Sequence, residues 1–117
     1  MEKSLKRIIF ATLVAGSTQI ATGALAKEPI IGTWKAESGA LVKISSCGAA
    51  FCAKVVSGKF SGRSIGKMTG KNGQYKGTIT NPSEGKTYRG KAWMSGKNLK
   101  MRGYSGPFFD TQTWTRR

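Results

Sequence analysis

Glycine spacing constrains the fold of this chain more than any other feature. Most of the 16 glycines fall between residues 32 and 106, where short runs of β-branched and aromatic residues separate them. Few apolar positions repeat at helical spacing, so the pattern favours strands joined by turns. We expect strands near 33–37, 40–46, 51–57, 64–69, 74–80, 86–95, 98–104 and 110–116.

Apolar and polar residues alternate within these runs. Val42 and Ile44 flank Lys43, and a similar alternation recurs in 86–95 and 98–104. This pattern is typical of antiparallel strands with one face in the core and one in water. The sequence therefore predicts an all-β fold, a small antiparallel up-and-down meander. Closure into a barrel would remove its exposed edges.

Turn signals separate the expected strands. Asn72-Gly73 is a two-residue hairpin signal, because both residues tolerate positive φ. Residues 81–85 form a longer turn that contains a proline and ends in glycine. The segment 58–73 is rich in Gly, Ser and Lys, and we expect a weak strand and loop region at the mouth of the barrel.

Residues 1–26 have the pattern of a secretory signal peptide. Three basic residues precede an apolar stretch at 8–15, and Ala24 and Ala26 occupy the positions that signal peptidase reads. The apolar stretch is shorter than the roughly 20 residues of a spanning helix. We expect cleavage after Ala26, a periplasmic or secreted location, and one domain over 27–117 without a transmembrane segment. An uncleaved N-terminal anchor is the alternative.

Cys47 and Cys52 are the two cysteines of the chain. An even pair in an exported protein indicates a disulfide, here across a hairpin with its tip at 48–50. Two free thiols or half a metal site are the alternatives. A zinc site needs about four ligands, and the chain has no His and no further Cys.

The expected mature domain is strongly basic. Residues 27–117 contain 17 Lys and Arg residues and four acidic residues. Such a field attracts polyanions in general, although charges scattered through every segment also suit a well-hydrated surface. Four cations on two expected neighbouring strands form a candidate surface for an anionic partner: Arg89, Lys91, Lys100 and Arg102. We expect no specific nucleic acid partner.

Catalytic chemistry finds little support in the composition. The chain has no His, so neither a Ser-His-Asp nor a Cys-His arrangement can form. Two acids could pair in principle, but three of the four acids in 27–117 lie at a terminus, a strand end or a turn. Asp110, near the start of the last strand, is the exception. We expect no enzymatic activity, no catalytic residue, no metal and no cofactor.

The two ends of the domain carry matching signals. Gly32 and Trp34 open the first expected strand, and Trp114 and Arg116 close the last one. In a closed meander these strands become neighbours. We expect the Arg116 guanidinium to cover a buried Trp through a cation–π contact, a structural role in barrel closure.

These end motifs resemble those of the lipocalin and fatty-acid-binding-protein superfamily. The chain is also similar, in several ordered blocks, to the exported bacterial family called domain of unknown function 2147. The blocks are 31–34, 42–48 with 51–52, 77–88, 99–104 and 111–116. The resemblance implies a lipocalin-like (calycin-type) barrel and a periplasmic or secreted location, and it brings no established activity.

Three functions are compatible with these features. We expect a monomeric, non-enzymatic binding protein, with an unknown apolar or amphipathic small ligand. One alternative is a basic envelope protein that binds anionic polymers through its outer surface. The other is a small protein inhibitor, which an exposed apolar turn at 106–109 would favour.

Overall fold

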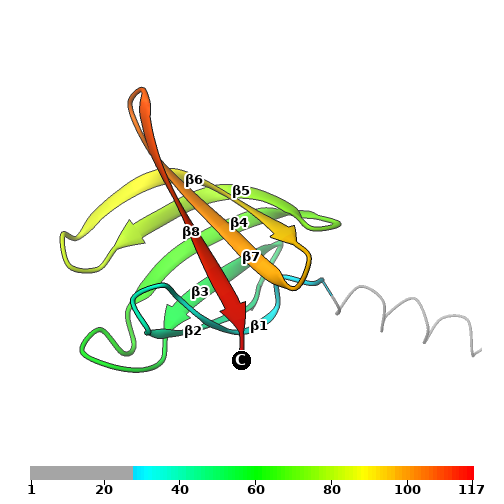
Figure 1. The fold of residues 1–117 in the computed structure, drawn as a ribbon, viewed down its shortest axis with the longest axis horizontal. Helices are drawn as coiled ribbons and strands as arrows, with labels where there is room; N and C mark the ends of the chain where they lie inside the picture. Colours follow the sequence, from blue (N-terminus) through cyan, green and yellow to red (C-terminus); the bar gives the residue numbers. More distant parts are fainter. Residues whose placement is uncertain (1–27) are drawn as a thin grey trace, which may run out of the picture.

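Residues 28–117, which the computed structural model describes, fold into a closed, antiparallel β-barrel (Figure 1). Each strand pairs with the next along the chain, and the last strand returns to the first. The expected all-β meander barrel is therefore confirmed, whereas the expected signal peptide at 1–26 lies outside the described residues. The strands are β1 (Gly32–Lys35), β2 (Leu41–Cys47), β3 (Ala50–Val55), β4 (Ser64–Lys71), β5 (Gln74–Asn81), β6 (Lys86–Ser95), β7 (Asn98–Ser105) and β8 (Phe108–Arg116).

The barrel interior is built by the residues that alternation places on the inner face. Val42 and Ile44 are buried, while Lys43 between them is exposed. Register carries this division from strand to strand, because directly paired residues point to the same face of a sheet. The inward side chains form one core, made of Ile30, Trp34, Val42, Ile44, Ala53, Val55, Ile65, Met68, Tyr75, Ala92, Leu99, Met101 and Trp114.

Strand β4 is longer than the composition of its segment predicts. It runs over Ser64–Lys71 and pairs with both β3 and β5, so the irregular part of 58–73 is confined to its first residues and the turn before β5. Gly70 makes this pairing possible at the end of the strand. Its φ is +147°, and a side chain there would collide with the backbone of β5.

Strand β8 begins two residues earlier than the sequence pattern predicts. Phe108 and Phe109 continue the ladder with the end of β7, which leaves Gly106 and Pro107 as the turn. The resulting hairpin projects beyond the rest of the barrel (Figure 1, orange). Its two phenylalanines are 75% and 60% exposed. Backbone pairing holds them in a strand although no core is available to the rings.

Candidate functional site

One end of the barrel is closed by the first described residues. Ile30 is fully buried, and the indole Nε1 of Trp34 donates a hydrogen bond of 2.9 Å to its carbonyl. The guanidinium carbon of Arg116 lies 4.0 Å from the centre of the Trp34 ring. Its terminal nitrogens donate to the carbonyls of Pro29 and Ile31, each at 2.9 Å. Arg116 therefore covers Trp34 and also ties the N-terminal segment across this end.

Gly32 contributes to the closure through a backbone conformation that residues with a side chain rarely adopt. Its φ is +141°, and a Cβ atom would lie 2.6 Å from the Nη1 atom of Arg116. Register places Trp34 directly opposite Arg116 where β1 meets β8. Trp114, the fourth residue that the sequence pattern assigns to closure, is 95% buried and lines a cavity inside the barrel.

A second hydrogen-bonded pair lies at the closed end. The hydroxyl of Tyr75 donates to Oε1 of Glu28 at 2.7 Å, and the backbone N–H of Asn72 donates to the same oxygen. Burial is the main cause that raises the pKa of Tyr75 to about 12, and the hydrogen bond to Glu28 raises it further in the same direction. The N-terminal segment is thus fixed to the β4–β5 hairpin as well as to β8.

The opposite end of the barrel opens into a cavity of about 870 Å³. This volume lies within the roughly 300–1,000 Å³ range of small-molecule sites. Side chains from six strands converge on its depth, because each occupies an inward position of its strand. The apolar part of the lining includes Val42, Val55, Ile65, Ile79, Met101 and Trp114.

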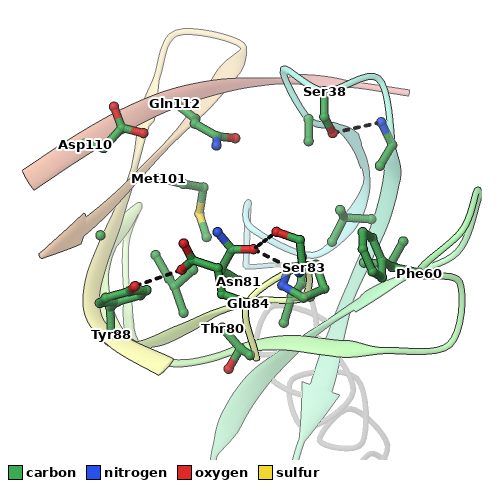
Figure 2. Close-up of a pocket in the computed structure, with 18 of the residues that line it drawn as sticks. Ser38, Phe60, Thr80, Asn81, Ser83, Glu84, Tyr88, Met101, Asp110 and Gln112 are labelled. Carbon is green, nitrogen blue, oxygen red and sulfur yellow. Dashed lines mark hydrogen bonds between the residues drawn. The ribbon is translucent and has the colours of Figure 1, made fainter. Parts of the chain in front are cut away.

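The mouth of the cavity is formed by loops and strand ends that are distant in sequence. Figure 2 shows Asp110 and Gln112 of β8 on one side of the opening, with Phe60 on another. The turn 81–85 lies between these walls. Phe108 at the projecting hairpin also belongs to the lining. The cavity therefore has an apolar depth and a mixed polar and aromatic rim.

Hydrogen bonds hold several of the rim side chains in place. The hydroxyl of Tyr88 donates to Oε1 of Glu84 at 2.9 Å, and this bond is the main cause that raises the pKa of Tyr88. Asn81 accepts from both the backbone N–H and the hydroxyl of Ser83 (Figure 2). These contacts give the 81–85 turn a defined shape at the cavity mouth.

Glycines on the inner face help to determine where the cavity lies. Gly77, Gly90 and Gly103 are directly paired across β5, β6 and β7. A Cβ atom at Gly77 would meet backbone atoms of β4, and one at Gly90 would meet Ile79. A Cβ atom at Gly103 would have no heavy atom within 4 Å. The space beside Gly103 belongs to the cavity, and a side chain at this position would enter it.

The predicted disulfide is present. Cys47 and Cys52 are bonded across the β2–β3 hairpin, and their Cα atoms lie 5.8 Å apart. The turn comprises Gly48 and Ala49, because Ala50 already pairs with Cys47 as the first residue of β3. A disulfide persists in oxidising compartments, so this bond fits a location outside the cell.

The four cations assigned to an anionic surface lie on the outer face of β6 and β7. Lys91 is directly opposite Arg102, Arg89 is opposite Tyr104, and Lys100 is opposite Trp93. The two Arg side chains contact aromatic rings, and the Lys100 ammonium donates to Thr113. The structure therefore places these cations on adjoining strands, outside the barrel and away from the cavity lining.

Sequence reasoning assigned none of the mouth residues to a ligand site. In the sequence, Glu84 and Asp110 stand out only as candidate catalytic acids, and Phe60 carries no signal. The Gly- and Ser-rich composition of 58–73 did point to the barrel mouth, and Gly58, Lys59 and Phe60 do line the cavity.

Metal and membrane signals are missing from residues 28–117. No group of three or more Cys, Asp or Glu side chains there could hold a metal ion. Within the same range, no helix has the length and apolar character to span a bilayer.

Comparison with known protein families gives one match. The family model described as "Uncharacterized protein conserved in bacteria (DUF2147)" matches residues 60–116. Over these residues the chain is similar to the DUF2147 family. The resemblance seen in the sequence is thereby confirmed. No curated protein and no solved structure matched the chain. The DUF2147 segment spans β4 to β8, so it includes both the 81–85 turn and the projecting hairpin at the cavity mouth.

Proposed function

We propose that this protein is an exported, non-enzymatic binding protein that holds one amphipathic small molecule in the open end of its barrel. The observation that carries this proposal is the cavity of about 870 Å³ with its apolar depth. An eight-stranded barrel has an interior wide enough to hold one small ligand when side chains leave it unfilled. Burial of an apolar ligand segment against Met101 and Trp114 would supply the affinity.

The rim supports a polar end on the ligand. The amide of Gln112 and the hydroxyl of Tyr88 can exchange hydrogen bonds with a head group at the mouth. Two acids, Glu84 and Asp110, belong to the lining, against one basic residue, Lys59. On a protein with such an excess of positive charge, this local balance favours a neutral or cationic head group over a carboxylate.

Composition supports binding over catalysis. The chain has no His, so a nucleophile at the cavity would need a base of another type. Asp110 and Glu84 are the acids of the lining, and each suits recognition of a ligand head group at the rim.

Export rests on the signal-peptide pattern of residues 1–26 together with the disulfide. We expect the mature protein to begin at Lys27, as the periplasmic or secreted form. Intact mass measurement of the protein recovered outside the cytoplasm tests this. A recovered species that still contains residues 8–15 would contradict it.

The cavity is tested by filling it. Gly103→Leu places a side chain in the cavity at a position where a Cβ atom has no heavy atom within 4 Å, and Thr115→Leu adds the same side chain at an exposed outer position of β8 as a control. We expect a dansyl-labelled alkylamine to bind the unaltered protein and the Thr115→Leu control, with energy transfer from Trp114. Affinity should fall at least about tenfold in Gly103→Leu, which corresponds to about 1.4 kcal/mol. Equal affinity in all three proteins would refute the interior site.

The projecting hairpin supports a second candidate, a small protein inhibitor. Phe108 and Phe109 are exposed at its tip, as an inhibitory loop would require. The Phe108→Ser/Phe109→Ser variant separates the two candidates. A changed rate of alkylamine uptake would support a role of the hairpin at the cavity mouth. The inhibitor would be supported if the variant takes up the alkylamine at an unchanged rate and no longer inhibits a protease that the unaltered protein inhibits.

A further inference from the structure

The outer face of the barrel carries a continuous cationic row across three strands. Lys76 of β5 lies directly opposite Lys91 of β6, and Lys91 lies directly opposite Arg102 of β7. Like charges in directly opposed positions of a sheet repel each other and destabilise it. The row (Lys76, Lys91 and Arg102) therefore costs the fold stability unless negative charge compensates it.

The acids of the described chain are engaged elsewhere. Glu28 accepts hydrogen bonds at the closed end, and Glu37 accepts from the backbone N–H of Thr113. Glu84 and Asp110 line the cavity mouth. Within residues 28–117 these are all the acidic side chains. The acids of residues 28–117 therefore leave the row to be neutralised by solvent ions or by an anionic partner.

A shallow groove of about 340 Å³ adjoins the row on the same outer face. Gly77 and Gly90, which take inward positions of β5 and β6, contribute only backbone atoms to its lining. The other lining residues include three cations and one aromatic ring. The groove is lined by Thr69, Lys76, Gly77, Arg89, Gly90, Lys91 and Tyr104.

The arginines of this face are held in position before any ligand arrives. The guanidinium carbon of Arg102 lies 5.0 Å from the ring centre of Trp93 and 4.3 Å from that of Phe109. Its Nε atom donates to Oγ1 of Thr111 at 2.7 Å. The terminal nitrogens of Arg102 are then available for a bidentate contact, which suits phosphate oxygens. Arg89 similarly lies 5.5 Å from the ring centre of Tyr104.

We propose that the cationic row and the groove with Arg89 form a binding site for a linear, phosphate-bearing polymer of the bacterial envelope. Neighbouring strands are about 4.8 Å apart, so three opposed cations span about 10 Å, more than one phosphate group occupies. A chain of phosphates crossing the strands would neutralise each cation in turn. This site is separate from the barrel cavity, and only its envelope location rests on the export proposed above.

A nucleic acid fits this face less well. Single-stranded nucleic acids bind by stacking bases on free aromatic rings. Here the rings of Trp93, Tyr104 and Phe109 are in contact with guanidinium groups. The face offers charge for a phosphate backbone, and each of its rings already has a guanidinium against it where a base would have to stack.

The test compares two double variants that remove equal charge. Lys76→Gln/Lys91→Gln interrupts the row, and the control Lys43→Gln/Lys54→Gln removes another directly opposed lysine pair, across β2 and β3. Binding of a short linear polyphosphate is measured over a series of salt concentrations. We expect the row variant to bind about tenfold more weakly, with a salt dependence reduced by about two released counterions. The control should change less than about twofold.

Three measurements accompany the polyphosphate titration: the melting temperature, the alkylamine affinity and the binding of single-stranded DNA. The melting temperature of the row variant should equal or exceed that of the unaltered protein, because a repulsive pair is gone. Its alkylamine affinity should be unchanged, which separates this proposal from the cavity. Equal polyphosphate losses in both double variants would refute a localised site and indicate general attraction by net charge. Single-stranded DNA of equal charge binding more tightly than polyphosphate would also overturn the proposal.

Discussion

At the residue scale, a few side chains connect distant parts of the barrel. Arg116 contacts the Trp34 ring and two carbonyls of the N-terminal segment. Tyr75 binds Glu28 from the same segment. The first and last strands are paired at only two positions, so these contacts supplement the β1–β8 ladder at the closed end. The closed end is therefore where single substitutions should cost most stability.

Replacement of Trp34 by Ala tests the closure. The indole is fully buried, and loss of such a side chain costs about 3–5 kcal/mol through lost burial and the cavity that remains. The measurement is urea denaturation followed by circular dichroism. Trp93→Ala is the matched control, since Trp93 lies half-buried on the outer face and should cost less. Equal midpoints for Trp34→Ala and the unaltered protein would show that closure does not depend on this ring.

Tyr75 predicts a specific loss of stability at high pH. Its folded pKa of about 12 exceeds the unfolded value of 10.0, so the neutral phenol is the form that the fold stabilises. This contribution is complete below pH 10 and is lost as the pH rises towards 12. Tyr75→Phe cannot ionise, so its free energy of unfolding should fall less steeply over that interval. Parallel pH curves for the two proteins would contradict the assignment.

At the element scale, hairpins carry most of the organisation. The β2–β3 hairpin is cross-linked near its tip. The β7–β8 hairpin extends past the barrel (Figure 1), and Phe108 and Phe109 of this hairpin line the cavity. These two elements differ in what fixes them. The first has a covalent bond and buried residues, whereas the second relies on backbone pairing at its exposed end.

Removal of the disulfide should weaken the fold modestly. The bond between Cys47 and Cys52 closes a loop with a sequence separation of 5, for which chain entropy predicts about 2 kcal/mol. Cys47→Ser/Cys52→Ser should therefore unfold at lower urea concentration with a similar m-value. The reduced unaltered protein serves as a second comparison. Unchanged midpoints in both would show that the hairpin gains nothing from its cross-link.

At the scale of the whole molecule, two proposed sites occupy opposite faces of the same strands. Strands β5, β6 and β7 contribute Ile79, Tyr88 and Met101 to the cavity, and the cationic row to the outside. Period-two alternation produces this division, because successive side chains point to opposite faces. One sheet can therefore bind an amphipathic molecule inside and an anionic polymer outside.

Salt should separate the two sites. Polyphosphate on the cationic row should be released by about 0.3 M salt, where the screening length is roughly 5–6 Å. The alkylamine in the cavity should remain bound, because apolar burial depends little on Coulomb attraction. The measurement is simultaneous titration of both probes on one sample. Polyphosphate retained at high salt, or joint release of both probes, would contradict two independent sites.

The sequence by itself determined the order of the strands, most of the turns, the cross-link and the outward placement of the cations. These depend on local pattern: alternation decides which face a residue takes, and glycine positions decide where the chain reverses. Even the Lys91–Arg102 pairing follows once the hairpin turn is known, because a two-residue turn sets the register. Contacts over short sequence separations are therefore predictable.

Only the tertiary structure decided which end of the barrel is closed and where a cavity lies. Gly90 and Gly103 are alike in sequence, yet Ile79 fills the space at one and nothing fills it at the other. The mouth brings Phe60 and Asp110 together from loops and strand ends that share no local pattern. The cavity volume depends on how side chains from every strand fill one shared interior. Packing of the whole barrel therefore sets this volume, and no single segment predicts it.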